Sequence, residues 1–505
     1  MGVVLVAVAG GGYLYIRSLD SNLRKGALHE DPKAQVAASQ PDQYGHTPLN
    51  ILLIGSDGRT SKADCKLGGS CDDSPPHADV EMLVHLSADR SNASILSIPR
   101  DTRVDLADCQ GHNNRTNEQI TDSLNFGGPA CVVDTWQKFT KIHIDHYMMI
   151  DFAGVVSMAD AIKGVQVCTK QNVFDYQVTY DKTGRHEIGS HLLYPAGSRK
   201  IQGEQALEWL RTRHAFGDGS DLGRATAQHL YLNSMLRQMK SVGTLTNISE
   251  MNGLAVAATR ALQVDDKITG ISSLLNLALQ FNKVDPKRMT TMTIPTHYGS
   301  NPGNPANLPV ILTQPASDQI FAQIRDDVPF DKNAAAAPAT TAPTPSATVA
   351  APATPTEKAA VQLTVQNFSG VDKRGLAITD SLVAQGFTRA TRDTRNDTAA
   401  ATTLTYPTAQ KAQAQAVATA LGLKDSALIA SSTATRLTLV IGTDWKTGNR
   451  FVAAALPPAA APPTGTETQN AADDTQCMSV NPAYLHGKPE YSWPLGGTPP
   501  VVPQP

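Results

Sequence analysis

Three features are absent or weak in this sequence, and each absence narrows the function. The six cysteines form no CxxC pair and no Cys/His cluster, which argues against a zinc site. The formal net charge of −3 is small for 505 residues, so we expect no broad electrostatic surface for nucleic acid. The first apolar run, residues 2–16, is shorter than the roughly 20 residues that span a bilayer as a helix. Because the net charge is small, any anion-binding site must be a local cluster of basic residues.

The six cysteines are scattered along the chain. An even number of scattered cysteines is typical of an oxidising compartment, and buried free thiols in a cytosolic protein are the alternative. We expect disulfides first between the close pairs and then, by elimination, between the remaining two residues: Cys65 with Cys71, Cys109 with Cys131, and Cys168 with Cys477.

The beginning of the chain indicates a membrane anchor. The run GVVLVAVAGGGYLYI, residues 2–16, holds no charge and precedes Arg17, Arg24 and Lys25. It has no basic stretch before it and no convincing cleavage site for a signal peptide. We interpret residues 1–17 as a partial transmembrane anchor whose cytoplasmic start lies upstream, and residues 18–47 as a juxtamembrane segment. The alternative is a buried strand or helix of a soluble protein.

Strand-like and helix-like segments alternate over residues 48–330. Short apolar runs predict strands at residues 49–54, 82–86, 93–98 and 289–294, a strand passing into a helix at 147–162, and helices within 203–239 and at 271–281. A polar, glycine-rich loop at residues 217–223 interrupts the long helical stretch. This alternation predicts an α/β domain with an α/β/α layered architecture.

A second, smaller domain follows a linker. Residues 331–358 are mainly Ala, Pro and Thr, a composition that cannot bury a core. A β-α-β-α-β succession over residues 359–448 predicts a small α/β domain, in which we find no catalytic cluster. Residues 449–505 form a Pro/Ala-rich tail, where only Cys477 and Trp493 hint at an ordered part.

Polar clusters follow the ends of the predicted strands and helices of the first domain. Loops at strand ends are where rigid scaffolds present catalytic groups. The clusters are Asp57 with Arg59, Asp79, Arg100 with Asp101, and Arg211 and Arg213 with Asp218, Asp221, Arg224 and Gln228.

These residue types suit phosphoryl transfer. Arginine forms bidentate hydrogen bonds with phosphate and stays charged, and Mg²⁺ is held by one or two carboxylates together with water and phosphate oxygens. Each cluster is a weak signal alone, since Arg100 with Asp101 is also the pattern of a structural ion pair and Asp57 that of a turn residue.

Several sequence blocks closely resemble the signatures of the LytR-CpsA-Psr family. In order they are ILLIGSDGR, HADVEMLVHL, SIPRDTRV, LNFGGP and WLRTRHAFGDGSDLGRATAQ, and they cover roughly residues 48–240. The second domain, with VQNFSG, TLTY and LTLVIGTDW, is similar to the LytR C-terminal domain of actinobacterial members. The resemblance implies an α/β/α sandwich with a hydrophobic groove for a polyprenyl chain.

The resemblance also implies roles for individual residues. Asp57 and Asp79 match the residues that coordinate Mg²⁺, with Mn²⁺ as the alternative ion. The expected contacts to the pyrophosphate are made by Arg59, Arg100, Arg211, Arg213 and Gln228. Asp101 and Asp221 would orient these arginines, and Arg224 lies in the family's Asp-x-Gly-Arg block, so that the expected catalytic set comprises Arg59, Arg100, Asp101, Arg211, Arg213, Asp221 and Arg224.

The implied activity is that of a phosphotransferase in cell wall assembly. It would move a glycopolymer from a polyprenyl-pyrophosphate carrier to a hydroxyl of peptidoglycan, on the extracytoplasmic side of a membrane that the protein crosses once. The polymer, whether teichoic acid, capsule or arabinogalactan, is left open, and so is the general base. Two alternatives are a non-catalytic polyprenyl-phosphate-binding or regulatory envelope protein, and a pyrophosphatase acting on the same lipid-linked glycan.

Three positions depart from the family pattern. His77 stands where many members have arginine, Gln119 where some have lysine, and Ala227 where a basic residue is common. None of them touches the two aspartates, so we expect them to affect affinity and substrate choice rather than the chemistry.

Overall fold

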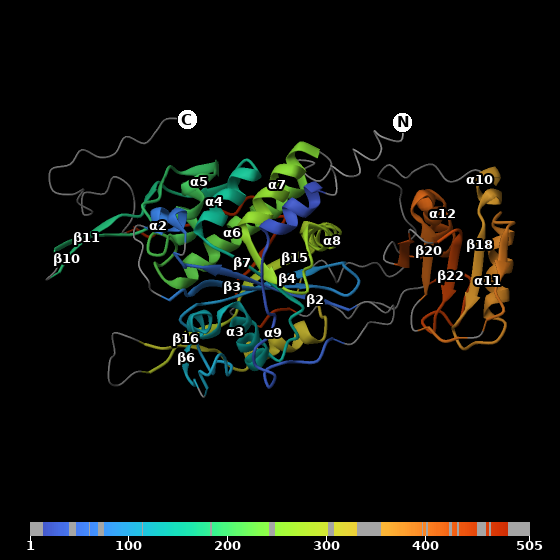
Figure 1. Cartoon of the computed structure of the whole chain (residues 1–505), viewed down its shortest axis with the longest axis horizontal. Coiled ribbons are helices and arrows are strands. Elements are labelled where there is room, and N and C mark those ends of the chain that lie inside the picture. Colours follow the sequence, from blue (N-terminus) through green and yellow to red (C-terminus); the bar gives the residue numbers. More distant parts are fainter. Residues whose placement is uncertain are drawn as a thin grey trace.

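The computed structural model contains two α/β bodies, each with its own sheet (Figure 1). The residues that the structure describes are 14–39, 47–59, 61–68, 75–113, 115–181, 184–241, 248–300, 308–330, 355–395, 397–399, 402–423, 427–431, 434–451, 461–463 and 466–482.

An eight-stranded mixed sheet forms the centre of the first body. Its strand order is β1-β14-β7-β2-β3-β4-β15-β23. Most residues of the central strands β2, β3, β4 and β15 are buried, because helices cover both faces of the sheet. The strands are β1 (Arg24–Gly26), β2 (Leu49–Ser56), β3 (Ala78–Leu86), β4 (Ala93–Ile98), β7 (His146–Ile150), β14 (Leu262–Asp265), β15 (Met289–Thr293) and β23 (Thr468–Asn470).

Helices lie in two layers, one on each face of this sheet (Figure 1). One layer holds α4 (Phe152–Ala161), α5 (Gly203–Arg211), α6 (Asp221–Ser241), α7 (Ile248–Ala261) and α8 (Ile271–Asn282). The other holds α3 (Ser123–Thr140) and α9 (Ala316–Arg325), whose Trp136 and Phe321 pack against Leu52 and Leu83 of the sheet. The predicted α/β/α sandwich is therefore confirmed.

The strand register brings the polar clusters to one edge of the sheet. Strands β2 and β3 run antiparallel with Ser56 opposite Ala78, and β3 and β4 run antiparallel with Glu81 opposite Ile98. The end of β2, the start of β3 and the end of β4 consequently lie next to one another. Asp57, Asp79 and Arg100 occupy these three positions.

Short elements surround the sheet. They include α2 (Lys62–Gly68), the 3-10 turns η1 (Ile120–Asp122) and η2 (Pro286–Arg288), and small two-stranded pairs. These pairs are β5 (Arg103–Val104) with β6 (Glu118–Gln119), β8 (Val165–Thr169) with β13 (Gly197–Ile201), β9 (Val173–Phe174) with β12 (Leu193–Tyr194), β10 (Gln177–Asp181) with β11 (Gly184–Ile188), and β16 (Thr296–Tyr298) with β17 (Val310–Leu312).

The second body is a five-stranded sheet with strand order β19-β18-β22-β20-β21. The strands predicted here are present, and two short ones, β19 and β21, were not predicted. Its core is separate and includes Trp445 and Phe387. The elements are α10 (Pro355–Ala360), β18 (Leu363–Asn367), α11 (Arg374–Ala384), β19 (Ala390–Arg392), β20 (Thr403–Pro407), η4 (Thr408–Gln410), α12 (Lys411–Leu421), β21 (Leu428–Ser431) and β22 (Leu437–Ile441).

Two of the three predicted disulfides are present. Cys109 bonds Cys131 with a Cα–Cα separation of 5.8 Å, and Cys168 bonds Cys477 with a separation of 4.5 Å. The third predicted pair includes Cys71, which lies outside the described residues. The greater part of the predicted anchor, residues 1–13, is outside them as well; within the described part of the chain, no helix combines the length and the apolar character needed to cross a membrane.

Candidate active site

The candidate site contains two aspartates, Asp57 and Asp79, that lie at the ends of neighbouring strands. Asp57 follows β2, and its carboxylate accepts a hydrogen bond of 2.6 Å from the backbone N–H of His77. Burial raises the pKa of Asp57 above its ordinary value, the charge of Asp79 raises it further, and the bond from His77 opposes the rise. The two carboxylates are thus close enough to repel one another, which makes a bound cation favourable between them.

Arg100 connects this acidic pair to the next cluster. It follows β4 and forms an ion pair with Asp79. Its Nε lies 3.6 Å from Oδ1 of Asp101, and Oδ2 of Asp101 lies 3.6 Å from Nη2 of Arg213. Asp101 also accepts a hydrogen bond of 2.9 Å from the side chain of Gln119. Asp101 therefore lies between Arg100 and Arg213, and its role in orienting them stays a prediction.

Arg211 ends helix α5 and lies partly buried against the same site. Its guanidinium donates to the backbone oxygen of Leu67 at 3.1 Å and sits 4.9 Å above the ring of Phe152. Burial lowers the pKa of Arg211, and the positive charge of Arg59 lowers it further, whereas Asp79, Asp57 and Glu208 act in the opposite direction. Two guanidinium charges that oppose one another in this way favour an anion between them.

The loop of residues 212–220 and the first turns of α6 complete the site. Gly223 lets this loop cross the helix closely, because a Cβ at this position would lie 2.4 Å from the backbone oxygen of Phe216. Arg224 and Gln228 follow one helical turn apart and are largely buried. The side chain of Asp221 lies outside the described residues, so its predicted role stays a prediction.

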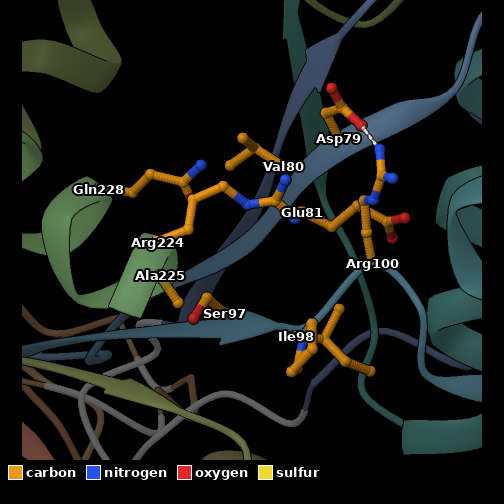
Figure 2. Close-up of a pocket in the computed structure, with 10 residues that line it drawn as sticks. Asp79, Val80, Glu81, Ser97, Ile98, Arg100, Arg224, Ala225 and Gln228 are labelled. Atoms are coloured by element: carbon orange, nitrogen blue, oxygen red, sulfur yellow. Dashed lines mark hydrogen bonds and ion pairs between the residues drawn. The ribbon is translucent and has the colours of Figure 1, made fainter. Parts of the chain in front are cut away.

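A small pocket gathers residues of three of these segments (Figure 2). Asp79 and Arg100 point toward one another on one side, and Arg224 extends from α6 toward β3 on the other. The amide of Gln228 donates to the backbone oxygen of Leu210 at 3.2 Å, which ties the helix to the end of α5. The structure therefore brings the predicted arginines, the two aspartates and Gln228 into one region.

One residue of this pocket, Glu81, was not predicted. It is 2% exposed, and burial raises its pKa to about 8, although a hydrogen bond from Trp136 opposes the rise. A signal was present, since Glu81 is a charged residue that stands between the apolar residues Val80 and Met82 within a strand. Strand periodicity alone could not indicate that Trp136 faces Glu81.

Two of the positions that depart from the family pattern contact the acidic groups. The expectation that none of these positions touches the two aspartates is wrong for His77. Its backbone N–H donates to Asp57, and its ring lies between Asp57, at 3.7 Å, and Asp122, at 3.5 Å. Gln119 bonds Asp101 as described above. Both residues therefore act on carboxylates of the site, and Ala227 is buried in the core beside Trp209.

The donor set fits a hard divalent cation of the Mg²⁺ type. Asp57 and Asp79 offer two carboxylates, and Mg²⁺ is commonly held by one or two while water and phosphate oxygens fill the remaining positions. Among the described residues, no cluster of three or more His, Cys, Asp or Glu side chains is arranged to hold a metal. The two carboxylates therefore suit a metal ion that also takes ligands from water and substrate, and they do not suit one that is bound by protein ligands alone.

The sequence is similar to several bacterial proteins of known name. The Corynebacterium glutamicum cell wall biosynthesis protein LcpA is 27% identical over 331 residues, which are 58% of this chain and 58% of LcpA. The Bacillus subtilis polyisoprenyl-teichoic acid–peptidoglycan teichoic acid transferase TagV is 26% identical over 294 residues, 58% of this chain and 68% of TagV. The chain thus spans little more than half the length of LcpA.

Solved structures were also matched. A LytR-Csp2A-Psr enzyme from Actinomyces oris has a TM-score of 0.43 and 20% identity, covering 60% of this chain and 96% of that one. Bacillus subtilis TagV has a TM-score of 0.43 and 23% identity, covering 55% of this chain and 96% of that one.

Two families match the sequence in separate segments. Residues 360–445 match the family described as LytR cell envelope-related transcriptional attenuator. Residues 13–325, which hold every predicted site residue, match the LytR_cpsA_psr family. Since this second match covers more than half of the sequence, the chain belongs to the LytR_cpsA_psr family.

Proposed function

We propose that this protein is a phosphotransferase that moves a glycopolymer from a polyprenyl-pyrophosphate carrier to a hydroxyl of peptidoglycan. The observation that carries the proposal is the gathering of two carboxylates and several arginines from separate segments at one sheet edge. The names of LcpA and TagV, a cell wall biosynthesis protein and a teichoic acid transferase, support the same class of reaction.

The arginines form a receptor for a diphosphate. Arg59 and Arg211 repel one another, and this repulsion is relieved when an anion lies between them. Arg100 and Arg213 are held by the shared Asp101 at the adjoining side. A pyrophosphate offers several oxygens to such a group, and guanidinium forks bind them in pairs.

Asp57 and Asp79 are the residues that would hold Mg²⁺, or Mn²⁺ in its place. When bound, the ion supplies charge neutralisation for the pyrophosphate oxygens. Arg100, which forms an ion pair with Asp79, stands beside these two carboxylates and would contact a phosphate oxygen.

An apolar cluster beside the pocket suits the prenyl chain. Ile51, Met82, Val84 and Ile95 of the sheet pack with Leu232, Leu236, Leu277 and Phe281 of α6 and α8, and these helix residues are only partly buried. Val80 belongs both to this cluster and to the lining of the polar pocket. A lipid bound here would place its charged head in the polar pocket and its apolar tail against the apolar cluster.

The reaction is a displacement at phosphorus. The oxygen of a peptidoglycan hydroxyl forms a bond to the phosphorus next to the glycan, and the bond from that phosphorus to the oxygen of polyprenyl phosphate breaks. The hydroxyl proton passes to a carboxylate of the site or to the departing phosphate. The arginines stabilise the negative charge that is spread over the transferring group.

A position on the outer face of the cell membrane accords with two further observations. The disulfides Cys109–Cys131 and Cys168–Cys477 are typical of an oxidising compartment. Leu14, Tyr15 and Ile16, the last residues of the apolar run 2–16, are exposed, as expected where a membrane-embedded helix leaves the bilayer. We include a single N-terminal membrane anchor in the proposal.

Transfer of a lipid-linked glycan to peptidoglycan oligomers tests the proposal. Arg100→Ala and Arg213→Ala are expected to lower the rate by about a hundredfold or more, the usual loss when one charge-stabilising donor is removed. Arg260→Ala, an exposed arginine of α7, is the matched control and should transfer normally. Chelation of divalent ions should stop transfer, and Mg²⁺ or Mn²⁺ should restore it.

The two alternatives give different results in the same assay. A binding or regulatory protein would bind the lipid pyrophosphate and never consume it. A pyrophosphatase would release free glycan phosphate without linkage to the wall. Either result with the unaltered protein would contradict the proposed transferase.

A further inference from the structure

A segment near the end of the described chain belongs physically to the first domain. Residues 466–482, here called the strap, follow the second domain in sequence and lie beyond both family matches, which cover residues 13–325 and 360–445. Within the strap, β23 pairs antiparallel with β15 and forms an edge of the eight-stranded sheet. The chain therefore leaves the first domain, builds the second, and returns.

The strap is held by covalent, apolar and backbone contacts together. Cys477 is bonded to Cys168 across a sequence separation of 309 residues. Met478 and Val480 are buried in the cluster that contains Trp209 and Phe216. The Met478 backbone N–H donates to the oxygen of Cys168 at 2.9 Å, and its own oxygen accepts from Lys170 at 2.9 Å. An unanchored tail would not bury side chains in this way.

The far end of the strap lies against the loop of residues 212–220. The N–H of Gly217 donates to the oxygen of Ser479 at 2.9 Å, and the N–H of Asn481 donates to the oxygen of Ala215 at 2.9 Å. The side-chain amide of Asn481 donates to the oxygen of His214 at 3.0 Å. The strap thus binds the three loop positions His214, Ala215 and Gly217, which directly follow Arg213.

This loop decides where Arg213 lies. The side chain of Arg213 is 39% exposed, and its distance to Asp101 is 3.6 Å, longer than a close ion pair. A fixed backbone beneath a half-exposed arginine lowers the entropy cost of holding its side chain in one position. Here the backbone is fixed on one side by helix α5 and on the other by the strap.

We infer that the strap is a positioning element of the arginine site. The second domain then lies within a chain segment whose two ends are joined by the Cys168–Cys477 bond. Only the contact of Arg213 with a pyrophosphate rests on the proposed function. The coupling of the strap to loop 212–220 rests on the hydrogen bonds alone. Damage to the strap should therefore weaken pyrophosphate binding without unfolding the first domain.

Two strap variants and one control of the full chain test this inference. Asn481→Asp keeps the size of the side chain and removes the donor to His214, at a half-buried position where the fold should tolerate it. The double variant Cys168→Ser with Cys477→Ser releases the strap more completely. Glu467→Gln changes an exposed residue at the opposite end of the strap and is the control.

Three measurements are made on each protein. They are the amide hydrogen exchange of residues 212–220, the Kd for farnesyl pyrophosphate with Mg²⁺, and the kcat and KM of transfer. We expect faster exchange at Gly217, a Kd raised about tenfold or more, corresponding to 1.4 kcal/mol, and a higher KM in both strap variants. The melting temperature of Asn481→Asp and all values of Glu467→Gln should match the unaltered protein.

The outcomes separate this inference from the proposed function. Unchanged exchange and unchanged Kd in both strap variants would overturn the inference, whatever the transfer rate. If the unaltered protein binds farnesyl pyrophosphate but transfers nothing, the proposed function fails, while a raised Kd in the variants still supports the strap. If it does not bind this probe, the exchange at residues 212–220 decides alone.

Discussion

The indole N–H of Trp136 donates a hydrogen bond to the carboxyl group of Glu81, directly beneath the candidate active site. Trp136 comes from α3 and Glu81 from β3, and both are buried. The second oxygen of Glu81 has no hydrogen-bond partner among the described residues. Because this buried carboxyl has a single donor, loss of the bond from Trp136 should lower the free energy of unfolding.

Removal of this donor should cost more than the loss of apolar contact. Trp136→Phe leaves the carboxyl of Glu81 without its bond, and we expect a loss of roughly 1–3 kcal/mol of unfolding free energy from this cause alone. In a Glu81→Met background, the same substitution should cost less, because no polar group is left unsatisfied. Urea unfolding of the four proteins measures the coupling. Equal costs in both backgrounds would contradict it.

Asp101 should act through the arginines rather than on the substrate directly. Asp101→Asn keeps the shape of the side chain but removes the charge that faces Arg100 and Arg213. We expect a transfer rate about tenfold lower and a weaker affinity for pyrophosphate, with an unchanged melting temperature. Asp105→Asn, at an exposed aspartate that accepts a bond from the Asn117 backbone, is the control. An unaltered rate in Asp101→Asn would remove the orienting role.

His229 should make the protein less stable in acid. It is 2% exposed in α6, and burial lowers its pKa to about 4, from 6.5. The folded state holds the neutral ring, so its contribution is present above pH 6.5 and is lost as the pH falls toward 4. Between pH 7 and pH 5 this should cost roughly 2 kcal/mol.

His229→Leu removes this titration and should flatten the acid limb of the stability curve. Chemical unfolding of both proteins at several pH values measures the difference. Parallel loss of stability in the two proteins would show that other groups cause the acid sensitivity.

Removal of the second domain should depend on how the deletion is made. Deletion of residues 359–448 keeps the strap, and the remaining linker can still bring it to β15, since loop closure depends weakly on length. We expect this protein to retain transfer to soluble peptidoglycan oligomers. A chain that ends at residue 330 lacks the strap and should lose most of its transfer.

Wall retention of the two proteins, measured separately, tests the second domain itself. If that domain binds wall polymer, both deletions should lower retention equally. Retention equal to that of the full chain would remove this role, and equal transfer by the two deletions would contradict the dependence on the strap.

Much of the fold could be predicted because its signals are local. The strand at Ala93–Ile98 has the predicted bounds, and the second domain contains the predicted β-α-β-α-β succession. Apolar runs that are closed by Gly, Pro or charged residues define such elements without tertiary information. Strand β23 was missed because its sequence, Thr-Gln-Asn, has no apolar period, and it is held by its pairing with β15.

The sequence predicted which residues make up the candidate site, but only some of the contacts between them. Arginines and aspartates after strand ends indicated a phosphate site, and the structure gathers Asp57, Asp79 and Arg100 there. The ion pairs that order them, such as that between Asp101 and Arg213, join residues more than a hundred positions apart. No local pattern encodes such a pairing.

By itself, the sequence determined which segments become strands and helices and which kinds of side chain stand at their ends, because these depend on near neighbours along the chain. Only the tertiary structure decided that Glu81 is buried under Trp136 and that the strap returns to fasten the loop behind Arg213. Both relationships depend on contacts between distant segments. They exist only once the sheet register and the two helix layers have placed those segments against each other.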